Sequence, residues 1–241
     1  NIVLCTYRRT ENLKNVFESL NNQTVSDNIL LHVLNNYDND KQQIENILGN
    51  SNYKFQYNVS HYRNKNNIWE RFIYAKKLVR LNKQLEYIIF IDDDMTYSKD
   101  WVEKLFNLRQ KNHMITWYVK LFDLKNNNLD YSRSSLITYN DSINNSNTKI
   151  QYGNYGGPGG CIIDASLFKD PRLYQINTDE MKKMDDLWIS YIINHVKKWK
   201  IKRSFLVPNL LPSVSDTLYD SMKHKKQSFL FYLRTRMGWN N

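Results

Sequence analysis

The sequence predicts an α/β fold with a mostly parallel central sheet flanked by helices, a smaller β element in its second half, and a C-terminal helix. Two observations carry this prediction. Through residues 1–110, short apolar runs alternate with segments whose apolar residues recur at helical spacing. The strand-like runs are apolar at consecutive positions, which is typical of parallel strands covered on both faces.

Four strand–helix units are expected in order along the first half. The first strand is NIVLCTY, and the helix after it has apolar residues three and four positions apart: Leu13, Val16, Phe17 and Leu20. The expected strands are 1–7, 29–36, 53–60 and 86–91. The expected helices are 10–21, 40–48, 66–82 and 99–110. One face of the third helix is expected to carry Trp69, Phe72, Ile73, Leu78, Val79 and Leu81.

The second half is less regular. Residues 125–155 are polar and predict a long excursion with a hairpin around SSLITY, positions 134–139. Loops of this length in compact domains are commonly functional or mobile. Regular structure is expected to return in YGGPGGCIIDASLF, at 155–168. The elements expected after it are helix 185–199, strand 201–207 and an amphipathic helix 227–239.

Composition and length indicate one folded domain. Hydrophobic residues make up 41% of the chain and aromatic residues 14%, which excludes a disordered chain. A length of 241 residues allows a sizeable core. Because the chain starts at Asn1, without Met, and opens on a strand, we expect residues 1–241 to be a single domain excised from a longer polypeptide.

Membrane and disulfide signals are lacking in the sequence. No stretch approaches 18 apolar residues and no signal peptide is visible, so we expect a cytoplasmic location. The basic, amphipathic C-terminal region leaves peripheral membrane contact open. Cys5 and Cys161 lie in apolar, strand-like surroundings and are expected to be buried free thiols in a reducing compartment.

The chain carries a surplus of positive charge. Lys and Arg number 34 against 24 Asp and Glu, a formal net charge of +10, with clusters at 63–83, 197–203 and 223–226. Such a surplus suits an anionic partner: a nucleotide diphosphate, a nucleic acid or an acidic lipid. Charge alone does not choose among them, and solvated helix faces explain much of it.

Three consecutive aspartates follow the fourth strand, in IIFIDDDM. Asp92, Asp93 and Asp94 repel one another, so each must be solvated or paired. In a parallel sheet, ligands bind beyond the carboxyl ends of the strands, where this triplet lies. Carboxylate oxygens suit Mg²⁺ or Mn²⁺, which such sites hold together with substrate phosphates. The alternative is a capping cluster at a strand–helix junction.

Two further motifs are candidates for a site. The run Gly156-Gly157-Pro158-Gly159-Gly160 holds four of the seven glycines, which indicates close backbone approach or positive φ, or a plain tight turn. The pair Asp185-Asp186 opens the expected helix 185–199. Acidic residues are favoured there by the helix dipole whether or not they have a function.

The ordered set NIVLCTYRRTENLKNVFESLNNQT, LLHVLNN and IIFIDDDM resembles the nucleotide-sugar-dependent glycosyltransferases of the GT-A fold, particularly the family 2 type. The resemblance covers nearly the whole chain. It implies a GT-A (Rossmann-like) fold with a nucleotide-binding half, 1–110, and an acceptor-binding half, 111–241. The polar segment 125–155 and the C-terminal region would shape the acceptor site.

The resemblance also implies a donor site. Thr6 and Tyr7 would line the nucleobase pocket. Asn36 stands where the family usually has an aspartate facing uracil, and its amide offers both a donor and an acceptor. Arg71, in NNIWERFIYA, would contact the nucleotide or its phosphates, unless it is a solvated helix residue. Gly159 and Gly160 would lie beside the donor sugar.

Asp185-Asp186 resembles the family's Glu-Asp motif, which implies that Asp186 is the base of an inverting enzyme. Asp94 would be the main metal ligand, with Asp92 sharing the ion or nearer the ribose, and Asp93 and Asp185 would also line the donor site. His224 matches a late histidine that some relatives supply to the metal, although a surface position is the alternative. Lys225 and Lys226 beside it are candidates for phosphate contact. The remaining histidines show no ligand spacing: His32, His61, His113 and His195.

The sequence therefore predicts a Mn²⁺- or Mg²⁺-dependent glycosyltransferase that moves a sugar from a UDP-sugar to a hydroxyl of a glycan, protein or lipid. Two other classes stay open. DDDMT also fits haloacid dehalogenase-like phosphatases, with Asp92 as nucleophile and Asp94 as acid, although three strand–helix units precede it. A basic nucleic-acid-binding domain would explain the charge, but not acids at the strand ends, and no recognised motif of that class is present. A sugar-nucleotide pyrophosphorylase would need a Gly-rich loop after the first strand.

Overall fold

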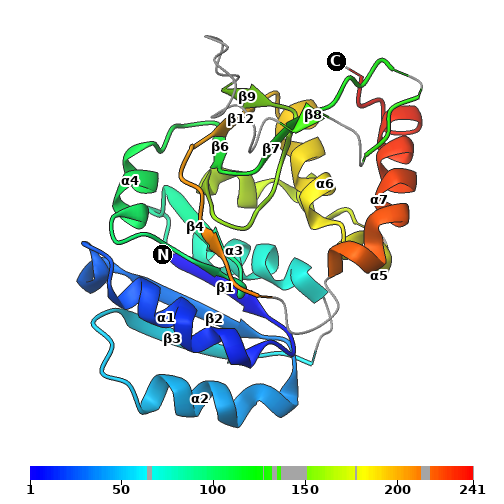
Figure 1. The fold of residues 1–241 in the computed structure, drawn as a ribbon. Helices are drawn as coiled ribbons and strands as arrows, with labels where there is room; N and C mark the ends of the chain where they lie inside the picture. The colour runs from blue at the N-terminus through cyan, green and yellow to red at the C-terminus, as the bar shows by residue number, and fades with distance from the viewer. Residues whose placement is uncertain are drawn as a thin grey trace.

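A computed structural model describes residues 1–63, 67–126, 128–131, 135–136, 151–176, 178–212 and 218–240. Its centre is an eight-stranded sheet in the order β3-β2-β1-β4-β11-β6-β12-β9 (Figure 1). Its strands are β1 (Ile2–Thr6), β2 (Leu30–Asn35), β3 (Gln56–His61), β4 (Tyr87–Ile91), β6 (His113–Thr116), β9 (Tyr152–Gly153), β11 (Cys161–Asp164) and β12 (Lys200–Arg203). The first four strands are parallel, as the sequence predicts, whereas β11 runs antiparallel between β4 and β6. The α/β fold with a mostly parallel central sheet is confirmed.

Helices cover both faces of this sheet. The α-helices are α1 (Leu13–Asn21), α2 (Lys41–Gly49), α3 (Glu70–Leu81), α4 (Trp101–Asn107), α5 (Asp179–Lys182), α6 (Asp185–Tyr191) and α7 (Leu218–Thr235). Short helical turns are η1 (Thr10–Asn12), η2 (Ser26–Asn28), η3 (Asp38–Asp40), η4 (Asn67–Trp69), η6 (Ala165–Lys169), η7 (Pro171–Tyr174) and the π-helical η8 (Ile192–Val196). Because side chains alternate along a strand, Ile2 and Leu4 pack with α1, α2 and α4, and Val3 and Cys5 pack with α3, α6 and α7.

Two small β elements stand beside the central sheet. One has the order β10-β7-β8, and the other pairs β13 with β5. Their strands are β5 (Met95–Thr96), β7 (Val119–Leu121), β8 (Ser135–Leu136), β10 (Tyr155–Gly156) and β13 (Asn209–Leu210). The predicted hairpin at 134–139 is described only at 135–136, which pairs with β7; its other positions lie outside the described residues.

Several predicted boundaries are wrong. The helix expected at 185–199 leaves α-helical geometry at Ile192, and η8 ends before β12 begins at Lys200. The strand expected at 201–207 ends at Arg203, and the C-terminal helix begins at Leu218 instead of 227. Leu81, expected on the buried face of α3, is 74% exposed because it is the last residue of that helix.

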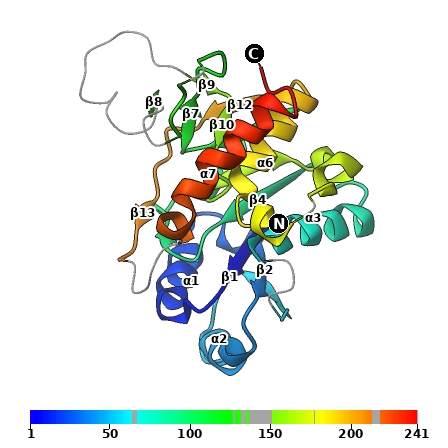
Figure 2. The same cartoon turned by 90° about the vertical axis from the view of Figure 1, so that its right-hand side faces the viewer.

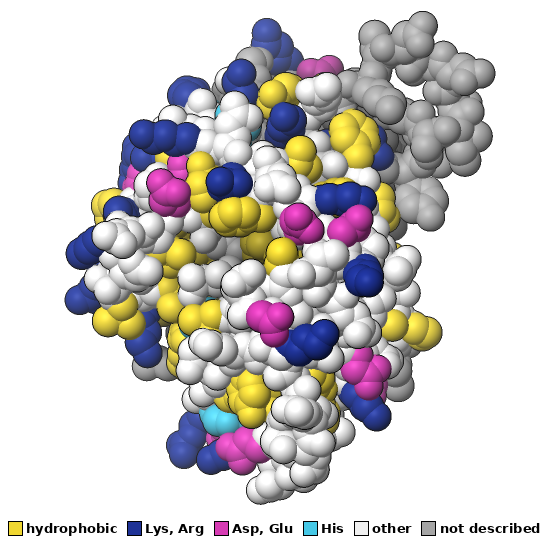
Figure 3. Space-filling model, turned by 90° about the vertical axis from the view of Figure 1, so that its left-hand side faces the viewer, with side chains coloured by type: hydrophobic (Ala, Val, Ile, Leu, Met, Phe, Trp, Pro, Cys, Tyr) yellow, Lys and Arg dark blue, Asp and Glu magenta, His cyan; other side chains and the backbone are white. Residues whose placement is uncertain are grey.

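Helix α7 lies against α6 (Figure 2). Phe229, Leu230 and Leu233 on α7 are buried, and the Phe229 ring stacks on Trp188 of α6 with 6.4 Å between centroids. Among the described helices, none is long and apolar enough to cross a membrane. On the face in Figure 3, Lys and Arg side chains are dispersed among Asp and Glu instead of forming one continuous basic surface.

Candidate active site

The candidate site lies where β2, β1 and β4 end side by side. These strands are neighbours in the sheet and run parallel, so their carboxyl ends meet at one edge. The residues there are Thr6 at the end of β1, Asn36 just after β2, and the triplet Asp92–Asp94 just after β4. The backbone N–H of Asn36 donates to the Thr6 carbonyl at 3.0 Å and so joins the ends of β1 and β2.

Two arginines neutralise the aspartate triplet. Arg71 Nη1 lies 3.0 Å from Asp92 Oδ1. Arg9 Nη1 lies 3.3 Å from Asp93 Oδ1 and 3.1 Å from Asp94 Oδ2. The repulsion among three adjacent carboxylates is therefore offset by fixed guanidinium groups in this structure.

Burial raises the pKa of two aspartates, Asp93 and Asp94. It raises the pKa of Asp93 to about 7, although Arg9 opposes the shift. Burial and the neighbouring Asp92 carboxylate also raise the pKa of Asp94, again against Arg9. Asp94 Oδ1 is buried and has no hydrogen-bond partner within the described part of the chain. A buried acceptor of this kind is expected to have a donor or a cation beside it.

Arg71 joins the triplet to the acidic pair at the start of α6. Its Nε lies 3.0 Å from Asp185 Oδ2, and its side chain is only 5% exposed. Burial lowers the pKa of Arg71, but Asp185 and Asp92 outweigh that effect and raise it. The alternative of a solvated helix residue is wrong. Asp185 is buried as well, and desolvation raises its pKa to about 6 although Arg71 opposes the shift.

Asp186 has different surroundings from Asp185. Its Oδ2 accepts a hydrogen bond from the Tyr155 hydroxyl at 2.6 Å and pairs with the ammonium of Lys226 on α7. Its Oδ1 accepts from the Leu187 amide at 2.8 Å. Burial raises the pKa of Asp186, but the Lys226 charge and these hydrogen bonds prevail, so the net pKa is lowered. The pKa of Asp185 is therefore raised and the pKa of Asp186 is lowered, although the two residues are adjacent.

Asn36 has a fixed orientation. Its Nδ2 donates to the Asn67 carbonyl at 2.8 Å and to Cys5 Sγ at 3.1 Å, and its buried Oδ1 lacks a partner within the described residues. Tyr7 is 40% exposed and meets Tyr37 edge to face, with 5.6 Å between ring centroids. Asn36 thus keeps a buried, unused acceptor at the residue before the half-buried Tyr37.

The glycine run packs directly on the triplet. A Cβ on Gly159 would lie 1.9 Å from Asp92 Oδ2, so a side chain there would require Asp92 to move. Gly160 has a φ of +70°, a region that favours glycine, and its amide donates to the Phe90 carbonyl of β4 at 2.9 Å. The close approach and the positive φ that the sequence predicts for this run are therefore confirmed, and the structure places Gly159 against Asp92.

His224 is exposed on α7. Across the ranges that the structure describes, no three His, Cys, Asp or Glu side chains come together as a metal-binding group. His224 is therefore not brought to Asp92 and Asp94 here. Of the two candidate lysines beside it, Lys225 pairs with Glu180, and Lys226 pairs with Asp186.

Four side chains of this site were not anticipated in these roles. Arg9 and Tyr155 carry no motif, nor does Lys120, a buried residue of β7 whose Nζ donates to the Tyr131 carbonyl at 3.2 Å. The sequence indicates Lys226 only as a candidate for phosphate contact. Arg9 gave the strongest signal, because it lies just beyond a strand end in TYRRT. The others are recruited from β7, β10 and α7, whose positions depend on tertiary packing.

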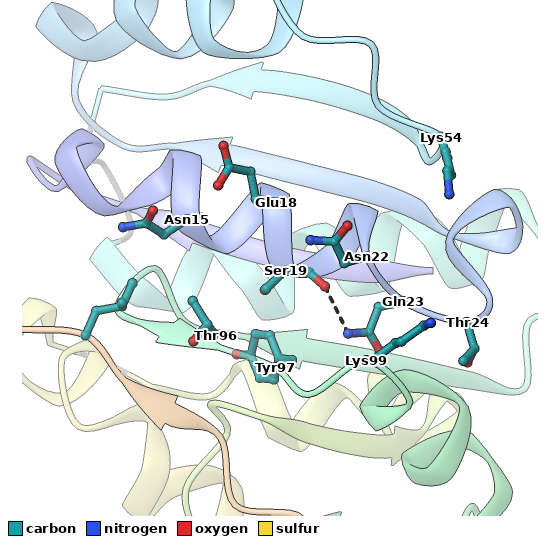
Figure 4. Close-up of a pocket in the computed structure, with 11 residues that line it drawn as sticks. Asn15, Glu18, Ser19, Asn22, Gln23, Thr24, Lys54, Thr96, Tyr97 and Lys99 are labelled. Atoms are coloured by element: carbon teal, nitrogen blue, oxygen red, sulfur yellow. Dashed lines mark hydrogen bonds between the residues drawn. The ribbon is translucent and has the colours of Figure 1, made fainter.

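A polar groove of about 890 Å³ runs along α1, beside β5 (Figure 4). Gln23 at its base is buried, and its amide donates to the carbonyls of Ser19 and Ser98 and accepts from the Val102 amide. These contacts join α1 to α4. The groove is a polar depression of the surface beside β5, the strand that directly follows Asp92–Asp94.

Comparison with known proteins agrees with this geometry. The sequence model of "Glycosyl transferase family 2" matches residues 1–169. No relative was found among curated proteins by sequence comparison. Among solved structures, S. aureus TarS in complex with UDP matches with a TM-score of 0.51 and 14% identity, over 90% of this chain and 57% of that one. The complex of S. aureus TarS with UDP-GlcNAc matches with a TM-score of 0.53 and 14% identity, over 90% and 59%.

The chain belongs to glycosyl transferase family 2, a family of glycosyltransferases, and it has the GT-A fold. At this identity the TarS structures show the fold alone. The chain spans less than two thirds of the length of those structures. Family membership sets aside the phosphatase and nucleic-acid-binding alternatives.

Proposed function

We propose that this chain transfers a sugar from a UDP-sugar to a hydroxyl of a glycan, protein or lipid acceptor. The observation that carries the proposal is the triplet Asp92–Asp94, which follows β4 at the edge where the parallel strands end and lies beside Arg71 and Arg9. Membership of family 2 supports the reaction class. The UDP and UDP-GlcNAc complexes of TarS, which shares the fold, support the donor.

Asp92 and Asp94 fit a divalent metal, Mn²⁺ or Mg²⁺. Ions of this kind are commonly held by one or two carboxylates together with substrate phosphates, so two aspartates suffice on the protein side. The partnerless Oδ1 of Asp94 supports this, because a cation would satisfy it. When bound, the ion would offset the charge that develops on the departing diphosphate. Arg9 and Arg71 would add fixed positive charge beside the donor.

Asn36 would read the nucleobase. Because its Nδ2 is engaged by Asn67, the group left for the base is the carbonyl oxygen, which accepts a hydrogen bond. Uracil offers one ring N–H that such an acceptor can bind. An asparagine therefore replaces the usual aspartate here without losing the acceptor, and Thr6 and Tyr7 would complete the pocket.

Asp186 would act as the base in an inverting transfer. Its carboxylate would take the proton of the acceptor hydroxyl while that oxygen bonds to the anomeric carbon and the bond to the diphosphate breaks. A positioned base contributes roughly 10²–10⁴-fold to such a step. Asp185, held by Arg71, would line the donor side together with Asp93, Gly159 and Gly160. A product with retained anomeric configuration would rule out this role of Asp186.

Calorimetric titration of UDP, GDP, dTDP and CDP, each with and without Mn²⁺, tests the proposal. We expect UDP to bind in a Mn²⁺-dependent manner and Asp94→Ala to weaken that binding at least about tenfold, equivalent to about 1.4 kcal/mol. Asp179→Ala is the matched control, because Asp179 is a surface residue whose side chain is 78% exposed. If the wild type bound none of the four nucleotides, the proposal would fail.

A further inference from the structure

Helix α7 places a buried cation on the candidate base. Lys226 is 8% exposed and Asp186 is also 8% exposed, so the ion pair between them is shielded from solvent. Both Lys226 and the Tyr155 hydroxyl contact Oδ2 of the carboxylate. A carboxylate oxygen accepts about two hydrogen bonds, so Oδ2 is saturated, whereas Oδ1 receives the Leu187 amide and keeps capacity for another donor.

A second layer holds Lys226 and Tyr155 in place. The Tyr131 hydroxyl lies 3.1 Å from the Tyr155 hydroxyl and 3.5 Å from Lys226 Nζ. Lys120 of β7 is 1% exposed, and its Nζ donates to the Tyr131 carbonyl at 3.2 Å. The side chains around Asp186 therefore come from β7, β10 and α7. Their mutual contacts restrict the side-chain conformations of Lys226 and Tyr155.

Packing does not account for a lysine at this position. Helix α7 is already attached through Phe229, Leu230 and Leu233, which are buried in the core. A buried ion pair gives weak net stabilisation, since removing both charges from water offsets much of their attraction. The family match ends at residue 169, so both Asp186 and Lys226 lie outside the matched segment.

We propose, on the basis of the function proposed above, that Lys226 is a positioning residue that holds Asp186 as an ionised carboxylate with Oδ1 turned to the acceptor hydroxyl. A general base must be unprotonated and correctly oriented, and burial alone would favour the protonated, neutral acid. The lowered pKa of Asp186 agrees with this role. The charged and titratable groups around it are Lys226, Tyr155, Tyr131, Lys120, Asp185 and, through Asp185, Arg71.

The direct test is the titration of Asp186 by carbon NMR, in protein labelled at the aspartate carboxyl carbons, with Asp186→Asn to identify its signal. In the wild type we expect Asp186 to stay ionised below the ordinary aspartate range of about pH 4. In Lys226→Met its midpoint should move upward by at least about one pH unit, because the opposing charge is gone. Lys226→Arg should restore the wild-type titration.

Lys225→Met is the matched control. Lys225 is the preceding residue on the same helix, its side chain is 54% exposed, and it pairs with Glu180 at the surface. It should leave the Asp186 titration unchanged. If Lys226→Met fails to fold, Lys226→Gln provides the same loss of charge with a hydrogen-bond donor retained.

A kinetic measurement separates this inference from the proposed function. For hydrolysis of UDP-GlcNAc with Mn²⁺, Lys226→Met should lower kcat at acidic pH and move the acidic limb of the profile upward, with the KM for the donor unchanged. An Asp186 titration identical in wild type and Lys226→Met would overturn the inference, whatever the activity. Failure of the wild type to bind UDP would instead overturn the proposed function, while the titration would still report on Lys226.

Discussion

Gly159 shows how one residue without a side chain maintains the acidic site. Its Cα lies so close to Asp92 that an added Cβ would meet Oδ2 at 1.9 Å and Cγ at 2.5 Å. The Gly159 carbonyl also accepts a hydrogen bond from Trp117 Nε1 at 2.9 Å, which holds the glycine run in place. Asp92 would therefore have to move if a side chain were introduced.

We expect Gly159→Ala to weaken Mn²⁺-dependent UDP binding at least about tenfold, or about 1.4 kcal/mol. The displaced Asp92 would lose its contact with Arg71 and its place beside the donor. Calorimetry with UDP and Mn²⁺ measures the effect. Gly49→Ala is the control, because a Cβ on Gly49 meets nothing within 4 Å. Unchanged affinity in Gly159→Ala would show that Asp92 does not take part in binding.

At the scale of the elements, Asp170 connects η7 to the segment that leads into β12. It caps η7 by accepting from the Arg172 amide at 3.0 Å, and it pairs with Arg172 Nη2 at 2.7 Å. Lys197, which follows η8, reaches the same carboxylate at 3.2 Å. The hydrogen bonds from Arg172 outweigh burial and hold the pKa of Asp170 well below its usual range.

Asp170→Asn should reduce the free energy of unfolding at neutral pH by up to about 1 kcal/mol, because it removes the charge that pairs with Arg172 and Lys197 although asparagine can still cap η7. Because the folded-state pKa is depressed, the stabilisation is present above the unfolded pKa of about 4 and is lost as pH falls below it. The difference between wild type and variant should therefore shrink below about pH 4.

Urea unfolding at a series of pH values measures this difference. Asp179→Asn is the control, because Asp179 is exposed and pairs only with a lysine on its own short helix. A wild-type advantage that stayed constant into the acid range would mean that the ionised carboxylate of Asp170 is not the stabilising form.

At the scale of the whole molecule, Arg71 couples the two halves of the chain. It comes from α3 and contacts Asp92 after β4 and Asp185 at the start of α6, two residues that are 93 positions apart in the sequence. The contact with Asp185 is shielded from solvent, whereas Asp92 is partly exposed. Arg71 is therefore needed in the fold itself as well as in the proposed donor site.

Arg71→Met should destabilise the protein by about 3–5 kcal/mol, because it leaves the buried Asp185 carboxylate without its partner. Urea unfolding of the free protein gives the value. Arg80→Met, on the exposed face of the same helix, should change stability by less than about 0.5 kcal/mol. A small effect of Arg71→Met would mean that Asp92 and Asp185 are protonated or solvated without the arginine.

Much of the fold could be predicted from local sequence patterns. The strand–helix alternation and the apolar strands predicted the parallel part of the sheet, and the strand-end rule placed the triplet at its edge. The antiparallel insertion of β11 between β4 and β6 was not predicted, because strand order depends on long-range pairing. The end of α6 was missed because the π-helical η8 continues the same apolar spacing.

For the site, the sequence by itself determined which acids follow the strands and where glycine is concentrated. Asp92, Asp93, Asp94, Asp185 and Gly159 could all be selected from their local context. Only the tertiary structure decided how those charges are balanced: Arg71 bridges Asp92 and Asp185, and Lys226 reaches Asp186 from a helix 40 residues later. The physical reason is that burial and pairing of a charge depend on neighbours in space, which spacing along the chain does not specify.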